Sequence, residues 1–181
     1  MSGSERRSVS AQRIVMLALQ WFVIAAAVLA LAALIAGQAG LLGGTPPPDL
    51  GVRGGRLKAP STTPNSVSSQ AALWPGHPQQ LAAQIAPLAL PAGSAGSGAA
   101  ALARIKAIVL AMPGGAVLRE EPGYLHAGFT TRLMKYTDDA EFWFDPAAGV
   151  VQVRSASRLG RKDFGANRAR IEHLRSLLAA P

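Results

Sequence analysis

Two strands and the turn between them can be read from AEFWFDPAAGVVQVRSAS, residues 140–157. Apolar side chains recur at every second position on both sides of the turn, at Ala140, Phe142, Phe144, Val151 and Val153. This two-residue period is typical of strands that bury one face. The intervening DPAAG, residues 145–149, suits a turn because Asp can bond the turn backbone, Pro presets φ and Gly can adopt a positive φ. We therefore predict an antiparallel hairpin made of strands 140–144 and 150–157.

Further strands are predicted on the N-terminal side of this hairpin. The segment 124–133 alternates, with apolar or small side chains on one face at Leu125, Ala127, Phe129, Thr131 and Leu133. Weaker strand patterns cover 85–90 and 116–120. Sequential strands joined by short turns favour an antiparallel meander.

Two helices are predicted to cover one face of this meander. Helical spacing of apolar residues runs over 99–112, with Ser97 as N-cap, and over 168–179, with Asn167 as N-cap. The fold class is therefore α+β, an antiparallel β-meander with helices on one face. Its core is expected to contain Leu102, Ile105, Val109, Phe129, Phe142, Phe144, Val151, Val153, Ile171 and Leu174.

Far upstream, residues 14–36 form an apolar run whose only strongly polar member is Gln20. At 1.5 Å per residue, a helix of this length is about 35 Å long, enough to cross the hydrocarbon core of a bilayer. We interpret the run as an uncleaved transmembrane anchor. A cleaved signal peptide is the competing interpretation, although its apolar core is usually shorter.

The sequence also predicts the order of the parts. Three arginines lie within residues 1–13, and the positive-inside rule places this tail in the cytoplasm and the domain outside it. Residues 37–56 are rich in Gly and Pro, which is typical of a linker. Residues 57–181 would form the folded α+β domain.

Composition restricts the chemistry of that domain. The chain has a net charge of +8 and no cysteine, which excludes disulfides, thiolate metal sites and a cysteine nucleophile. From residue 57 onward, 13 Lys and Arg oppose 8 Asp and Glu. Such a charge balance is consistent with an anionic partner, and equally with a solvated face on an Arg-rich protein.

Several strings in the domain are similar to one known family. They are PNSVSS (64–69), YLHA (124–127), DDAEFWFDP (138–146), VRSASRLG (153–160) and Asn167-Arg168. The chain over about residues 57–178 resembles the family catalogued as domain of unknown function 1499. The resemblance implies a fold and an envelope or membrane setting, and it implies no catalytic residues.

Polar residues of the strands suggest one binding site. Alternation is expected to bring Arg132, Glu141 and Arg154 to the sheet face opposite the apolar one, where a planar guanidinium could bind phosphate or carboxylate bidentately. We hypothesise an anion or lipid head-group site made of Arg132, Glu141, Arg154, Ser155, Ser157 and Arg158. The competing interpretation is a solvated charge ladder that keeps an exposed sheet face soluble.

A second hypothesis concerns acid/base chemistry. His126 could work with an acidic neighbour, Glu141 or Asp139, in a hydrolase or lyase. The three histidines, His77, His126 and His173, are not at ligand spacing, so no metal is predicted. No cofactor and no nucleic-acid partner are expected.

Two function classes stay open. The first is a membrane-anchored envelope protein whose domain binds an anionic lipid, glycan or protein partner without catalysis. The second is an uncharacterised hydrolase or lyase that uses His126. The sequence does not predict an oligomeric state.

Overall fold

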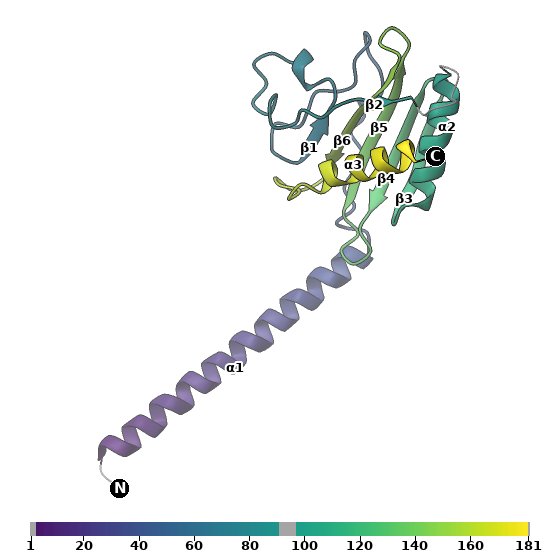
Figure 1. Cartoon of the computed structure of the whole chain (residues 1–181). Helices are drawn as coiled ribbons and strands as arrows, with labels where there is room; N and C mark the ends of the chain where they lie inside the picture. Colours follow the sequence, from purple (N-terminus) through teal and green to yellow (C-terminus); the bar gives the residue numbers. More distant parts are fainter. Residues whose placement is uncertain (1–2, 91–96, 181) are drawn as a thin grey trace.

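One long helix leads into an α+β domain in the computed structural model (Figure 1), which describes residues 3–90 and 97–180. The helix α1 spans Gly3–Gln38. Its part from Gln12 to Gln38 is 27 residues long and apolar enough to cross a membrane, with a length of about 40 Å at the helical rise. A signal sequence near the N-terminus can also be apolar enough to do so, so this helix alone is weak evidence for an anchor.

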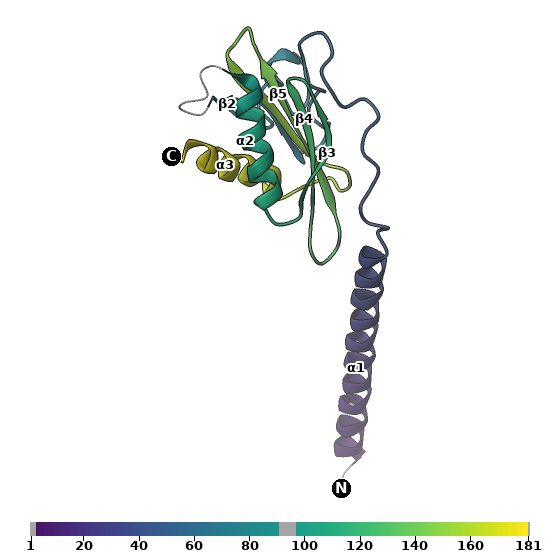
Figure 2. The same cartoon turned by 90° about the vertical axis from the view of Figure 1, so that its right-hand side faces the viewer.

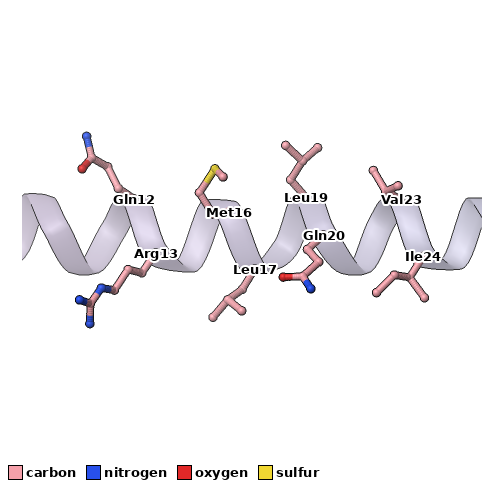
Figure 3. Close-up of a pocket in the computed structure, with 8 residues that line it drawn as sticks. All are labelled: Gln12, Arg13, Met16, Leu17, Leu19, Gln20, Val23 and Ile24. Carbon is pink, nitrogen blue, oxygen red and sulfur yellow. The ribbon is translucent and has the colours of Figure 1, made fainter.

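Side chains between Gln12 and Ala33 of α1 are exposed. Figure 3 shows eight of them, which include Arg13, Met16, Gln20 and Ile24 and line a shallow hollow along the helix surface. All lie in the segment able to cross a membrane. This hollow is lateral surface of the helix, and all eight of its lining residues belong to α1.

The strands form one antiparallel sheet. Their order in the sheet is β1-β6-β5-β4-β3, and β2 also pairs with β6. The bounds are β1 Ser66–Ser68, β2 Leu88–Ala89, β3 Gly115–Glu121, β4 Tyr124–Thr130, β5 Thr137–Asp145 and β6 Val150–Ser157. The predicted hairpin is confirmed, because β5 and β6 pair from Asp145↔Val150 back to Asp138↔Ser157.

The predicted fold class is confirmed as well. The helices α2, Gly98–Ala111, and α3, Ala166–Ala179, lie on the same side of the sheet (Figure 2). A short 3-10 helix, η1, covers Ala71–Leu73. Ser97 caps α2 as predicted, since its Oγ accepts from Ala100 N at 3.3 Å.

The predicted cap of α3 is wrong. Gly165 occupies the N-cap position with φ 85°, and Asn167 lies inside the first turn. Asp163 supplies the acceptors instead, to Gly165 N and Asn167 N, both at 3.0 Å. Asn167 is buried and bonds to the sheet.

The core lies between the sheet and the two helices. All ten predicted core residues belong to it, nine buried and Phe144 half-buried against the others. The alternation of β4 and β5 thus identified the inner face correctly. It failed at the end of β4, which stops at Thr130, so Leu133 lies in the loop to β5 with 63% of its surface exposed.

The other face of the sheet is covered by the chain between α1 and β1. This covering segment, residues 44–60, carries no helix or strand and crosses the sheet on the side away from α2 and α3 (Figure 2). Leu50 and Leu57 are buried there, and Gly51 N bonds to Glu141. Part of the predicted linker therefore packs as domain.

Candidate functional site

Polar side chains meet beneath the covering segment, on the sheet face away from the helices. The register pairs His126 with Glu141 and Glu141 with Arg154 across three neighbouring strands. Asp139 lies two residues before Glu141 on the same face. All four are buried, so the prediction of a solvated charge ladder is wrong.

Glu141 is the centre of this cluster. Its Oε1 accepts from Tyr124 Oη at 2.8 Å and from Gly51 N at 2.7 Å, and its Oε2 lies 3.4 Å from Arg154 Nη1. The carboxylate has no exposed surface. Burial, together with the nearby charge of Glu141, raises the pKa of the Tyr124 hydroxyl, which therefore stays a donor.

Arg154 joins the cluster to the covering segment. Its Nε donates to the carbonyl oxygen of Ala59 at 3.1 Å, and only 3% of the residue is exposed. Burial lowers the pKa of Arg154, while Glu141 and Asp139 oppose that shift. Its Nη2 makes no hydrogen bond within the described ranges, so this nitrogen is left as a donor.

Asp139 lies between His126 and Arg158 and bonds to both side chains. Its Oδ1 is 2.8 Å from His126 Nε2 and accepts from Arg158 Nη2 at 2.7 Å, while its Oδ2 accepts from Arg158 Nε at 2.9 Å. Burial by itself raises the pKa of Asp139, but the bonds from His126 and Arg158 outweigh it, and the net pKa is lowered. The bidentate pair fixes the Arg158 guanidinium in one plane.

The lowered pKa of Asp139 predicts a dependence of stability on pH. Its contribution is complete above the unfolded-state value of 3.8 and is lost as the pH falls through the lower folded-state value. Asp139→Asn should be less stable than the wild type at neutral pH, and the difference should shrink below pH 3.8. Denaturant unfolding at both pH values measures this; a difference independent of pH would contradict it.

A cavity opens beside this cluster. It has a volume of about 320 Å³ and lies where the covering segment meets the end of β6. Its charged lining residues are Lys58, Asp139, Arg154 and Arg158. Each of the three cations has a carboxylate partner, Lys58 with Asp49, Arg154 with Glu141 and Arg158 with Asp139, but only Asp139 of these carboxylates lines the cavity.

Uncharged donors and acceptors complete the cavity wall. Ser61, Thr63 and Asn65 line it with Lys58, and Lys58 pairs with Asp49 at the surface. Asn65 Nδ2 donates to the carbonyl oxygen of Gly160 at 2.7 Å, while its Oδ1 is buried without a partner among the described residues. The cavity therefore presents cationic and hydroxyl groups together.

The comparison with family models adds one finding. The model described as "Protein of unknown function (DUF1499)" matches residues 56–178. The chain belongs to the DUF1499 family. No curated protein and no solved structure matches it.

In this DUF1499 chain, the polar cluster and the cavity draw on the family-like strings. Asp139 and Glu141 come from the string at 138–146, and Arg154 and Arg158 from that at 153–160. The matched region begins just before Lys58, so it includes part of the covering segment. The matched region thus contains every charged group of the cavity.

The predicted residues of the anion site are only partly brought together. Glu141, Arg154 and Arg158 share the covered face, but Arg132 lies in the exposed β4–β5 loop outside it. Its placement beside Arg154 was wrong because β4 ends two residues earlier, at Thr130.

The two predicted serines point to the opposite face. Ser155 Oγ donates to Asn167 Oδ1 at 2.5 Å, and Ser157 Oγ accepts from Asn167 Nδ2 at 3.0 Å. Strand alternation explains these positions. Arg154 faces away from the helices, so the odd-numbered residues of β6 face toward them. The predicted role of Ser155 beside Arg154 is therefore wrong. Ser157 lines the cavity together with Arg154 and Arg158, although its hydroxyl accepts from Asn167.

The predicted acid/base pair exists as a contact but not as an open site. His126 and Asp139 are in contact, with 9% and 2% of their side chains exposed. Of the two, only Asp139 lines the cavity. Within residues 3–90 and 97–180 no group of three His, Asp or Glu residues is arranged to hold a metal.

Sequence reasoning missed Lys58, Asn65 and Tyr124. Tyr124 shares its face with His126 by strand alternation, so a signal existed for it. Lys58 and Asn65 lie in a stretch without periodicity, and only its approach to the sheet brings them to the cavity. The one sequence feature that Lys58 and Asn65 share is that both are polar residues placed after a stretch rich in Gly and Pro.

Proposed function

We propose that α1 remains attached and spans a membrane, with the domain on the extracytoplasmic side. The apolar segment Gln12–Gln38 is long enough to cross a bilayer. Three arginines precede the apolar run within residues 1–13, and the positive-inside rule then orients the tail toward the cytoplasm.

We propose further that the domain is a non-enzymatic binding domain for an anionic ligand. The observation that carries this is Arg154, a nearly buried guanidinium whose Nη2 keeps no partner among described residues while the side chain lines the cavity. Lys58 and Arg158 supply two more cations. Arginine forks suit phosphate and carboxylate oxygens.

The ligand class follows from the lining. A phosphate or carboxylate group would contact the cations, and hydroxyls of Ser61 and Thr63 could bond to its other oxygens. Phospholipid head groups, envelope glycans and acidic peptides all carry such groups. The chemistry they share is an oxyanion small enough for a cavity of about 320 Å³.

Lys58→Gln is expected to weaken oxyanion binding about tenfold, equivalent to about 1.4 kcal/mol. The lysine lines the cavity and is partly exposed, so its loss removes one charge without breaking the buried cluster. The measurement is calorimetric titration of the full chain in phosphatidylcholine nanodiscs with inorganic phosphate and with glycerol 3-phosphate.

Lys106→Gln is the matched control. Lys106 is also a partly exposed lysine in an ion pair, with Glu120, but it lies on α2 away from the cavity. This variant should bind like the wild type. The proposal fails when the wild type binds neither compound, or when Lys58→Gln and Lys106→Gln bind equally.

A further inference from the structure

Three segments meet at one end of the sheet, the end where α1 arrives. They are residues 37–44, the β4–β5 loop (131–136) and the β6–α3 loop (158–165), and together we name them the membrane-proximal rim. Figures 1 and 2 both show the β4–β5 loop beside the end of α1. Antiparallel pairing places the end of β6 next to the start of β5, so the third segment begins at the same end.

Direct contacts hold the rim together. Gln38 Nε2 donates to the carbonyl oxygen of Leu133 at 2.7 Å. A Cβ on Gly37 would lie 2.7 Å from Met134 O, so the helix and the loop touch backbone to backbone. A Cβ on Gly44 would lie 3.0 Å from Leu159 Cγ, which joins the third segment to the other two.

Because α1 ends on this loop, a membrane crossed by α1 must begin within a few residues of the rim. The apolar run ends at Ala36, and Gln38 already bonds to the loop. The Gly- and Pro-rich stretch predicted as a linker packs against the domain, so it does not hold the domain away from the bilayer. The rim faces the lipid head groups.

Exposed apolar side chains gather on this surface. The exposed fractions are 73% for Leu41, 63% for Leu133, 43% for Leu159 and 97% for Phe164. Four such side chains on one surface suit a bilayer, because aromatic and leucine side chains are favoured at the membrane interface.

Phe164 is held outward by its own turn. It adopts φ 52°, in the left-handed region that is unfavourable for a residue with a side chain. Asp163 Oδ1 accepts from Gly165 N at 3.0 Å, and Asp163 Oδ2 accepts from Asn167 N at 3.0 Å. Through Asn167 the turn is tied to β6, so the ring is presented by a built loop.

Cations surround the apolar groups. Arg132, Lys135, Arg161 and Lys162 belong to the rim, and none forms an ion pair with another described residue. Asp163, the rim's acidic residue, is occupied by the turn. Unpaired lysine and arginine next to exposed apolar side chains match the phosphate layer of a bilayer.

We infer that the membrane-proximal rim docks the domain onto the surface of the membrane that α1 spans. Phe164, Leu159, Leu133 and Leu41 enter the interface, and the four cations contact lipid phosphates. This inference rests on the proposed anchoring by α1 and does not depend on the anion cavity. It makes the domain a fixed membrane-surface unit.

The test uses the full chain, which has no cysteine, so that single cysteines can be labelled cleanly. Phe164→Cys and Ala147→Cys are labelled with a polarity-sensitive fluorophore in phosphatidylcholine vesicles with and without phosphatidylglycerol. Ala147 is exposed in the β5–β6 turn, at the far end of a nine-residue strand from the β4–β5 loop, so its label should stay aqueous.

The label at position 164 should report an apolar environment and be quenched by lipid-phase quenchers, more strongly with phosphatidylglycerol. Adding Arg161→Gln and Lys162→Gln should remove that dependence on the anionic lipid. The proposed docking is overturned if the fluorescence of the label at 164 reports an environment as aqueous as that at 147. This comparison applies to vesicles that retain the chain through carbonate extraction. Release of the full chain by carbonate would overturn the proposed anchoring by α1. The proposed anion binding in the cavity is tested separately, by phosphate titration of Lys58→Gln.

Discussion

Arg154→Met is expected to lower the free energy of unfolding by about 3–5 kcal/mol, the usual cost of removing one partner from a buried ion pair. Glu141 has no exposed surface and lies 3.4 Å from the guanidinium, so the variant leaves a buried carboxylate without its cation. The covering segment also loses the bond from Arg154 Nε to Ala59. Denaturant unfolding of the purified chain measures the change.

A second variant separates the charge effect from lost packing. Arg154→Met with Glu141→Gln removes both charges and keeps similar volumes, so it should recover part of the loss. Arg132→Met is the matched control, because Arg132 is exposed in a loop and should cost less than about 0.5 kcal/mol. An Arg154→Met cost as small as that of Arg132→Met would show that the buried pair contributes little.

This result bears on the role of Arg154 in binding. A residue that stabilises the covered face and also lines the cavity cannot test binding alone, because its loss disturbs the fold. Lys58 is better suited to that test, since the one ion pair that it forms with a described residue is at the surface, with Asp49. The buried cluster of Glu141 and Arg154 holds the cavity wall in place, and Lys58 contributes a partly exposed positive charge to that wall.

Strand alternation predicted the inner face of the sheet and the fold class. Residues such as Phe142 and Val153 face the helices because every second side chain of a strand points the same way. The same rule, followed strictly, would have separated Ser155 from Arg154. The wrong grouping came from taking a continuous family-like string as a continuous site.

The covered face could not be predicted by this rule. Alternation tells which side chains share a face, but not whether another part of the chain lies over that face. The covering segment has no apolar period, and its two buried leucines, Leu50 and Leu57, are isolated among Gly, Pro and charged residues. Composition alone therefore favoured a linker.

The position of Arg132 shows the other limit. Thr131 continues the alternation of β4, yet its backbone N–H bonds to the carbonyl oxygen of Tyr136 and begins the loop instead. Where a strand ends depends on which bonds its partner can offer, and β5 begins only at Thr137. A pattern of side chains does not contain that information.

Truncated chains that begin at Gly44 and at Leu57 are expected to differ in unfolding free energy by about 3 kcal/mol or more. The shorter chain loses the burial of Leu50, worth about 1.5–3 kcal/mol. It also loses the bond from Gly51 N to the buried Glu141 carboxylate, and hydrogen bonds to charged groups contribute about 1.5–3 kcal/mol. Denaturant unfolding of both chains, under identical conditions, measures the difference.

Point variants in the longer chain locate the source of that difference. Leu50→Ala should cost about 2–5 kcal/mol, as for other buried leucines, whereas Leu81→Ala, at a leucine 85% exposed, should cost less than about 0.5 kcal/mol. Equal stability of the two truncated chains would mean that residues 44–56 rest on the sheet without stabilising it. A large difference would make the covering segment part of the folding unit, and the cavity wall that it forms would then be as fixed as the sheet beneath it.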